Sequence, residues 1–148
     1  MRRHLHVLVW LIGMTAWVSC NNIPDCDEPN TFEVIVQFRD STNTESEEVI
    51  FDRISDLNSN VVFIEQDTLS QVELEINQSD TIMSYLFEAI DGVDTLTISY
   101  RQNILLRSEE CGPVQRFIDL EIRSHSFADT LLVNNELLRN EVNIQIIR

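Results

Sequence analysis

The feature that most restricts the fold is an alternation of apolar and polar residues. In the segment 71–76, Val72, Leu74 and Ile76 are separated by polar residues. A side-chain period of two is that of a β-strand with one buried face. The same alternation occurs over residues 32–38, 95–100, 118–123 and 142–146. In the last segment it predicts that Asn143 lies on the polar, solvent-facing side.

Turn signals support this interpretation. Asp91-Gly92 stands between two candidate strands and is a strong short signal for a hairpin. Gly112-Pro113 is predicted to interrupt the chain before the strand 118–123. Helix signals are weak and confined to residues 135–140. Less regular strand candidates cover residues 49–54, 61–64, 82–89, 103–107 and 130–133.

About eight to ten short strands at this spacing predict an all-β fold. We expect a single antiparallel β-sandwich, immunoglobulin-like or similar. A closed β-barrel is the alternative.

The first 19 residues have the organisation of an export signal. Arg2 and Arg3 give a short positive start, and Val7–Val18 is an apolar run of 12 residues. This run is shorter than the roughly 20 residues that span a bilayer and fits the apolar region of a signal peptide. We therefore expect a signal peptide over residues 1–19, a lipidated tether over 20–30 and a β-sandwich domain over 31–148.

Val18-Ser19-Cys20 resembles the bacterial lipobox, in which a small residue precedes the cysteine that receives lipid. Trp17 departs from the pattern, which usually has Leu at that position. Two acyl chains hold a protein stably on a membrane, so lipid on Cys20 predicts a membrane anchor. An ordinary secretory signal is the alternative, and both place the mature chain outside the cytoplasm. Asn21 is not the Asp of an inner-membrane retention signal, which favours the outer membrane, on either face.

Two cysteines remain, Cys26 and Cys111. An exported chain meets an oxidising compartment, where such a pair usually forms a disulfide. A redox-active dithiol is the alternative, but the Cys-x-x-Cys spacing typical of that chemistry is missing.

The chain from Cys20 onward is strongly acidic. It has eight arginines, no lysine and 25 carboxylates, which gives a formal charge of −17. This charge repels phosphate backbones and excludes nucleic acid as a partner class. It also argues against docking on anionic lipid by charge, so membrane attachment is expected to come from the lipid on Cys20.

Catalytic chemistry has few candidates. His125 is the one histidine after the signal, and Ser124, Ser126 and Asp129 lie near it in sequence. Adjacent strand residues point to opposite faces, which turns both serines away from His125. A two-carboxylate glycosidase needs a deep cleft, and a small sandwich with short loops offers little room for one. No catalytic residue is assigned.

No metal ligand or cofactor is assigned either. Zinc needs three or four His or Cys ligands, which the mature chain lacks. Calcium prefers oxygen ligands, and two acidic groups could supply some of them. Neither group has the spacing of an EF-hand loop. They are Asp25, Asp27 and Glu28 in the tether and the pair Asp91 and Asp94.

Several short motifs, in order along the chain, resemble a family of small Bacteroidota lipoproteins with a domain of unknown function. The most specific is Cys111-Gly112. The resemblance implies a lipid-anchored β domain with paired cysteines, and it carries no activity or functional residues. The matching features are Asp25-Cys26, Pro29, residues 34–40, residues 96–101, Glu110-Cys111-Gly112, Phe117, residues 133–135 and residues 143–146.

We therefore expect an envelope lipoprotein that is not an enzyme and that binds another envelope protein. A calcium- or small-ligand-binding module is the first alternative, and a hydrolase is the second.

Overall fold

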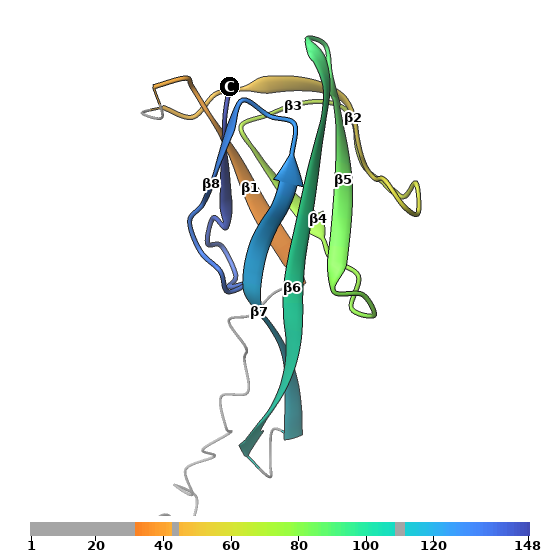
Figure 1. The fold of residues 1–148 in the computed structure, drawn as a ribbon, viewed down its shortest axis with the longest axis vertical. Coiled ribbons are helices and arrows are strands. Elements are labelled where there is room, and N and C mark those ends of the chain that lie inside the picture. The colour runs from red at the N-terminus through yellow and green to blue at the C-terminus, as the bar shows by residue number, and fades with distance from the viewer. Residues whose placement is uncertain (1–31, 43–44, 109–111) are drawn as a thin grey trace, which may run out of the picture.

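The computed structural model describes residues 32–42, 45–108 and 112–148, and this part of the chain contains nine strands and no helix (Figure 1). The expected all-β class is confirmed. The strands are β1 (Glu33–Arg39), β2 (Val49–Asp56), β3 (Val62–Leu69), β4 (Gln71–Glu75), β5 (Ile82–Ala89), β6 (Gly92–Ser108), β7 (Gly112–His125), β8 (Asp129–Leu132) and β9 (Ile144–Ile147).

The strands form two sheets that pack face to face as a sandwich. One sheet has the order β4-β1-β9-β8 and the other the order β3-β2-β5-β6-β7. Each sheet ends in two edge strands, so the sandwich is confirmed and the barrel alternative is wrong. Among the described strand pairs only β1 and β9 run parallel, with Val36 opposite Ile144. This pairing places the last strand beside the first, in the middle of the smaller sheet.

Aromatic rings join the two sheets at the core. Phe38 of β1 packs against Phe51 of β2 with ring centroids 5.0 Å apart, and Phe87 of β5 lies 6.1 Å from Phe51. Phe127 extends the group, 5.3 Å from Phe87. The centroid distances and tilted or edge-on angles are those that aromatic pairs prefer. These rings lie on the apolar faces that the alternating pattern creates.

The prediction for Asn143 is wrong, because its side chain is fully buried. Its Oδ1 accepts the Ile35 N–H at 2.9 Å, and its Nδ2 donates to the carbonyls of Glu136 (2.9 Å) and Asn134 (3.4 Å). A buried amide is tolerated when its donors and acceptor are all paired. Asn143 thus fixes the loop after β8 to strand β1.

The predicted break at Gly112-Pro113 is also wrong, since both residues belong to β7. Pro113 pairs with Leu106, and Gly112 adopts φ +71°, a left-handed conformation that glycine reaches without strain. Pro113 is tolerated because β7 is an edge strand, where a missing N–H can face away from the ladder. The separate strand expected over 103–107 is instead the end of β6, because no Gly or Pro interrupts the chain there.

Smaller differences concern the ends of segments. The β5–β6 hairpin is confirmed, but its two loop residues are Ile90 and Asp91, and Gly92 already belongs to β6. Phe32 precedes β1 and is exposed, although its ring packs edge-on against Phe117 at 5.6 Å. The segment 135–140 contains bends and a turn but no helix.

Candidate functional site

Several residues singled out in the sequence lie outside the described part of the chain. The expected signal peptide over 1–19 and tether over 20–30 lie outside it as well. Within the residues that the structure describes, no helix is long and apolar enough to cross a membrane. The residues outside are Cys20, Cys26, Cys111, Asp25, Asp27 and Glu28.

The side chains around His125 have separate partners. His125 Nδ1 lies 3.2 Å from the Phe127 carbonyl, and Ser126, which follows the end of β7, donates its hydroxyl to Asp94 at 2.7 Å. Asp129 accepts the N–H of Thr130. The structure therefore does not bring Ser126 or Asp129 to His125 as a nucleophile or an orienting acid.

Asp91 and Asp94, the described acidic pair weighed for calcium, are likewise held by other groups. Asp91 accepts from Arg148 Nη2 at 2.5 Å, and this bond holds the pKa of the Asp91 carboxyl below its usual value. Asp94 accepts from Ser126. No group of three or more His, Cys, Asp or Glu with metal-site geometry occurs in the described ranges.

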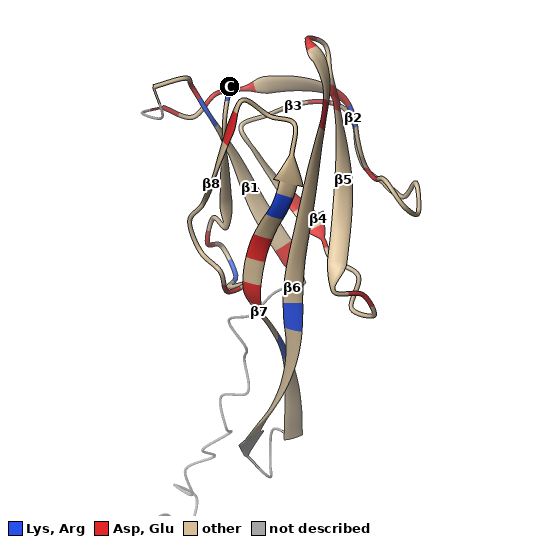
Figure 2. Ribbon diagram, viewed as in Figure 1, with Lys and Arg blue, Asp and Glu red and all other residues tan. Residues whose placement is uncertain are grey.

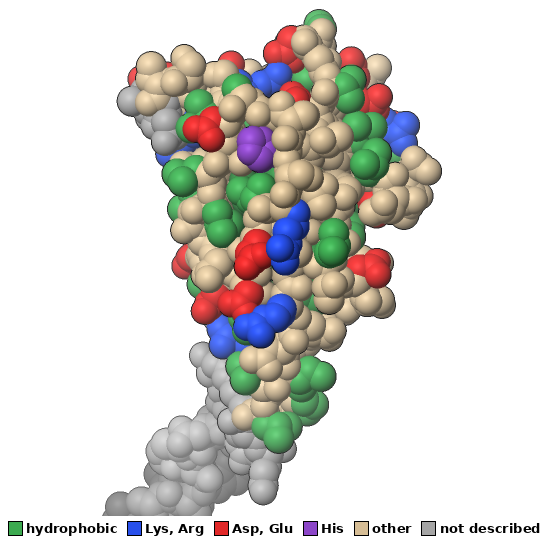
Figure 3. Space-filling view, in the orientation of Figure 1, with side chains coloured by type: hydrophobic (Ala, Val, Ile, Leu, Met, Phe, Trp, Pro, Cys, Tyr) green, Lys and Arg blue, Asp and Glu red, His purple; other side chains and the backbone are tan. Residues whose placement is uncertain are grey.

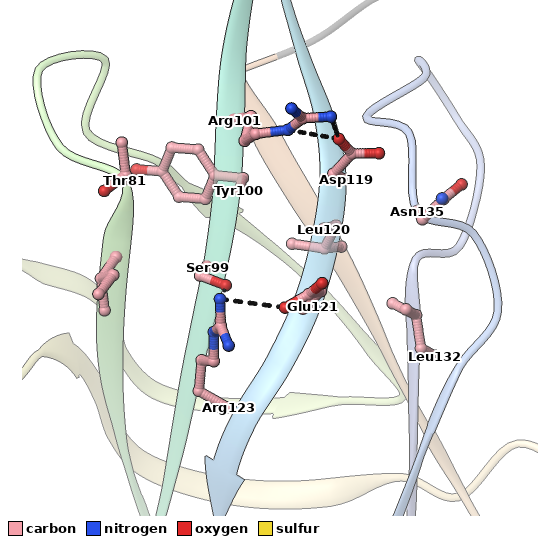
Figure 4. A pocket seen from close by; sticks show the side chains of 11 residues that line it. Thr81, Ser99, Tyr100, Arg101, Asp119, Leu120, Glu121, Arg123, Leu132 and Asn135 are labelled. Carbon is pink, nitrogen blue, oxygen red and sulfur yellow. Dashed lines mark hydrogen bonds and ion pairs between the residues drawn. The ribbon is translucent and has the colours of Figure 1, made fainter.

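An open hollow of about 630 Å³ lies beside β6 and β7, bordered by Leu132 and Asn135 (Figure 4). Two β-bulges in β7 shape it, because each adds one residue relative to β6. One bulge contains Arg123 and the other contains Asp119, which has φ +55°. Bulges re-aim side chains and are frequent beside binding sites. Asp tolerates this left-handed backbone better than most residues.

The polar groups of the hollow are paired with one another. Arg101 contacts the Asp119 carboxylate, Arg123 Nε donates to the Ser99 hydroxyl at 2.6 Å, and Arg123 Nη2 lies 3.1 Å from Glu121. Each cation thus has an anionic or hydroxyl partner from the adjacent strand. The charged groups of the hollow are therefore already paired within the protein. A ligand would have to displace these contacts in order to bind.

Three aliphatic side chains stand out at the far end of β6. We call residues 101–108 of β6 and 112–117 of β7 the ribbon. Beyond Tyr100, β7 is the one described strand that pairs with β6, and the two strands project from the lower end of the sandwich in Figure 1. Ile104 is 65% exposed and Leu106 is 83% exposed, with Leu105 also exposed between them. Figure 3 shows apolar side chains gathered at the ribbon end. Three consecutive apolar residues cannot all face one core, and that was a signal available in the sequence.

A second apolar surface lies at the opposite end of β6, around the β5–β6 hairpin. We call Ile50, Ile90 and Val93 the hairpin patch; they are 51%, 76% and 62% exposed. The Ile90 N–H donates to the Ile50 carbonyl at 3.3 Å, which ties the hairpin to β2. Acidic side chains accompany the patch on the same strands and loops: Glu48, Asp52, Glu88 and Asp91.

A smaller hollow near the start of β5 is lined by Asp56 and Asn77, among others. Two buried tyrosines, Tyr85 and Tyr100, lie next to it and donate hydrogen bonds to the backbone of its lining residues. Burial raises the pKa of Tyr100 to about 12, helped by the negative charge of Asp80, and burial raises the pKa of Tyr85 further still. The Tyr100 hydroxyl donates to the Asn77 carbonyl at 2.7 Å. Burial opposes ionisation of Asp56, but hydrogen bonds from Ser59 and Asn58 lower its pKa overall. These groups are therefore fixed by structural hydrogen bonds.

No protein-family model, no curated protein and no solved structure matches the chain. Its function is therefore inferred from its own surfaces.

Proposed function

We propose that the protein is a lipid-anchored, non-enzymatic lipoprotein of the cell envelope that binds another envelope protein. The observation that carries the proposal is the hairpin patch, in which Ile50, Ile90 and Val93 present aliphatic surface to water. Contiguous exposed apolar side chains with a polar rim mark interaction surfaces on many proteins.

The patch is preorganised, which favours binding. Arg148, whose side chain is mostly buried, holds Asp91 in the hairpin loop, and its backbone N–H donates to the Arg39 carbonyl. The hairpin is thereby tied to the end of the smaller sheet. A surface that is already ordered loses less conformational freedom when a partner binds.

Charge indicates the chemistry of the partner. Glu48, Asp52, Glu88 and Asp91 lie on the same strands and loops as the patch. They outnumber the two nearby arginines, Arg53, which lies 3.9 Å from Glu88, and Arg148, which is paired with Asp91. A complementary surface has an apolar centre bordered by lysine or arginine. We therefore commit to an envelope protein with a basic, apolar docking surface.

The test uses the full, lipidated chain in native envelopes with a photocrosslinking residue in place of Val93. The matched control carries it in place of Leu106, which is also exposed but lies on the ribbon. We expect one protein to be captured from position 93 in stoichiometric amount and not from position 106. The purified partner should then bind the Ile90→Ser/Val93→Ser variant at least tenfold more weakly, because two buried aliphatic contacts are lost.

Salt should weaken binding of the wild-type protein if acidic residues meet a basic surface. The proposal is wrong if position 93 captures no protein, or if the partner binds the double variant as tightly as the wild type.

A further inference from the structure

Strand β4 is an edge of the smaller sheet and turns half of its backbone groups outward. The Ile76 N–H donates to the Phe32 carbonyl at 2.9 Å, and this bond continues the antiparallel ladder between β4 and β1. In such a ladder, residues that exchange hydrogen bonds with the partner strand alternate with residues whose N–H and C=O groups point away from it. Among the described residues, β1 is the one strand that pairs with β4. Counted back from Ile76, the residues whose N–H groups point out of the sheet are Gln71, Glu73 and Glu75.

The pairing of β4 with β1 is regular over all five residues of the strand, and the strand contains no proline. Proteins protect exposed sheet edges against a further strand with bulges and prolines. The edges of the larger sheet have such interruptions: the pairing of β3 shifts register, and β7 contains bulges and Pro113. The backbone of β4 is therefore open to an added strand.

Charge indicates which kind of strand β4 can accept. Glu73 and Glu75 are exposed, and no described residue forms a salt bridge with either of them. Residues 54–81, which include β3 and β4, contain six carboxylates and no arginine, lysine or histidine, a formal charge of −6. Figure 2 shows acidic residues and no basic residue on β4. A second copy of β4 would place glutamates beside glutamates, and like charges on neighbouring strands are destabilising. Arginine or lysine at the same positions is attracted.

The smaller hollow near the start of β5 lies beside the same edge and has a volume of about 280 Å³. Phe63 of β3 lines it, as do Glu75 at the end of β4 and Ile76, which follows. Ser70 alone separates β3 from β4, although the two strands belong to different sheets, so the strands diverge from this residue and the hollow lies between their far ends. The side chain of Ile76 is buried. A residue opposite Ile76 on an added strand shares its inward face and points into the hollow.

We propose that β4 accepts an extended segment of another protein as an added antiparallel strand, with basic residues opposite Glu73 and Glu75 and an apolar residue opposite Ile76. Backbone hydrogen bonds to the outward groups of β4 supply affinity, and the alternating basic and apolar side chains supply specificity. This inference does not rest on the lipid anchor. It does not rest on the hairpin patch either, whose strands belong to the larger sheet.

The test uses the protein purified from native envelopes in a neutral detergent and a short synthetic peptide in which arginine alternates with leucine. A control peptide has the same side chains and charge, but its backbone nitrogens are methylated and cannot donate hydrogen bonds. Fluorescence anisotropy measures the affinity of each labelled peptide. Residue-resolved hydrogen–deuterium exchange follows the N–H groups of Glu73 and Glu75. The variant Glu73→Gln/Glu75→Gln is compared with Asp52→Asn/Glu65→Gln, which removes two exposed carboxylates from the larger sheet.

We expect the N–H groups of Glu73 and Glu75 to exchange quickly in the free protein and more slowly when the peptide is bound. The methylated peptide should bind at least about tenfold more weakly, because it cannot donate the backbone hydrogen bonds. Glu73→Gln/Glu75→Gln should weaken binding about fivefold, since two surface ion pairs are lost, and the control variant should weaken it less. Ile90→Ser/Val93→Ser should leave the affinity for the peptide unchanged, which separates this inference from the hairpin patch.

The inference is wrong if neither peptide binds, or if the methylated peptide binds as tightly as the unmodified one, because charge alone would then explain the binding. It is also wrong if the N–H groups of Glu73 and Glu75 are protected before any peptide is added. Protection that is independent of protein concentration would show that another part of this chain covers β4, and protection that grows with concentration would show that a second copy does. Loss of binding in the hairpin variant alone would place the peptide on the hairpin patch and overturn the inference.

Discussion

The two ends of the sandwich both expose aliphatic side chains, but they do so with different geometry. At the ribbon end, Leu105 and Leu106 point to opposite faces of two strands that pair with no third strand among the described residues. At the hairpin end, Ile50 and Val93 belong to a five-stranded sheet whose inner face is core. Exposure on the outer face of a packed sheet gives a surface that is already ordered before a partner binds. This geometry favours the hairpin end as the protein-binding surface.

Charge sharpens this difference. The described part of the ribbon carries three arginines and no acidic residue (Figure 2). Acidic residues accompany the hairpin patch on both β2 and β5. A single long strand, β6, thus carries apolar side chains to two ends of the sandwich that differ in charge.

The largest effect is expected from the cysteine pair that would reinforce the ribbon end. Cys26 and Cys111 lie six residues before Phe32 and Phe117 respectively, and these two rings are in contact. A disulfide there would close a long loop, which stabilises a fold by about 4 kcal/mol.

We therefore expect reduction, or Cys26→Ser/Cys111→Ser, to lower the free energy of unfolding by about that amount in denaturant titrations. Cys20→Ser is the control and should leave the midpoint unchanged. Detection of free thiols at both Cys26 and Cys111 in the isolated protein would contradict the pairing.

The next largest loss of stability is expected at Asn143, because its buried side chain hydrogen-bonds two segments of the chain. Asn143→Ala removes one acceptor and two donated hydrogen bonds and leaves the Ile35 N–H without this partner. The loss of these buried bonds should cost about 3 kcal/mol in the free energy of unfolding. Gln145→Ala, two residues further along, is the matched control. Its amide makes one half-buried bond to Gln37, so a loss of about 1 kcal/mol or less is expected. Equal losses for the two variants would show that the buried hydrogen bonds of Asn143 contribute no more to stability than the half-buried bond of Gln145.

The same residue shows what the sequence could and could not predict. Alternation identified most strands and the two-layer class, because one buried face per strand imposes a period of two. It placed Asn143 in solvent, since a period cannot reveal that the backbone of Ile35 and the backbone of the loop 134–136 converge on one amide. The break expected at Gly112-Pro113 failed for a related reason. A proline ends a strand where its missing N–H would have to face a neighbouring strand. The position of that neighbouring strand is set by the tertiary structure and not by the local sequence.

The candidate surfaces were less predictable than the fold. Ile104, Leu105 and Leu106 belonged to a weak strand candidate, and the run of three showed only that they cannot all share one buried face. The extent of their exposure depends on the tertiary structure, because no third strand or facing sheet lies beside that part of β6 in the described chain. The hairpin patch was hidden in the sequence because Ile90 and Val93 flank the expected turn and resemble core residues. The hollow beside β7 depends on two bulges. No residue pattern in the sequence predicts where one strand carries an extra residue relative to its partner.

The smallest effect is expected at the hairpin end, where an exposed carboxylate, Asp91, pairs with the mostly buried Arg148. Arg148 lowers the pKa of Asp91 in the folded protein below its ordinary value of 3.8. A carboxyl with a lowered folded-state pKa contributes stability above its unfolded-state pKa and loses it as the pH falls through the folded-state value. Asp91→Asn should therefore reduce the free energy of unfolding by about 0.2–1 kcal/mol at neutral pH, the usual range for an exposed pair. The gap between variant and wild type should close well below about pH 4.

Asp52→Asn, a change at an exposed carboxyl of the neighbouring strand, should show no such gap in the same titrations. A gap that persists unchanged in acid would mean that Asp91 acts through packing of the hairpin and not through its charge.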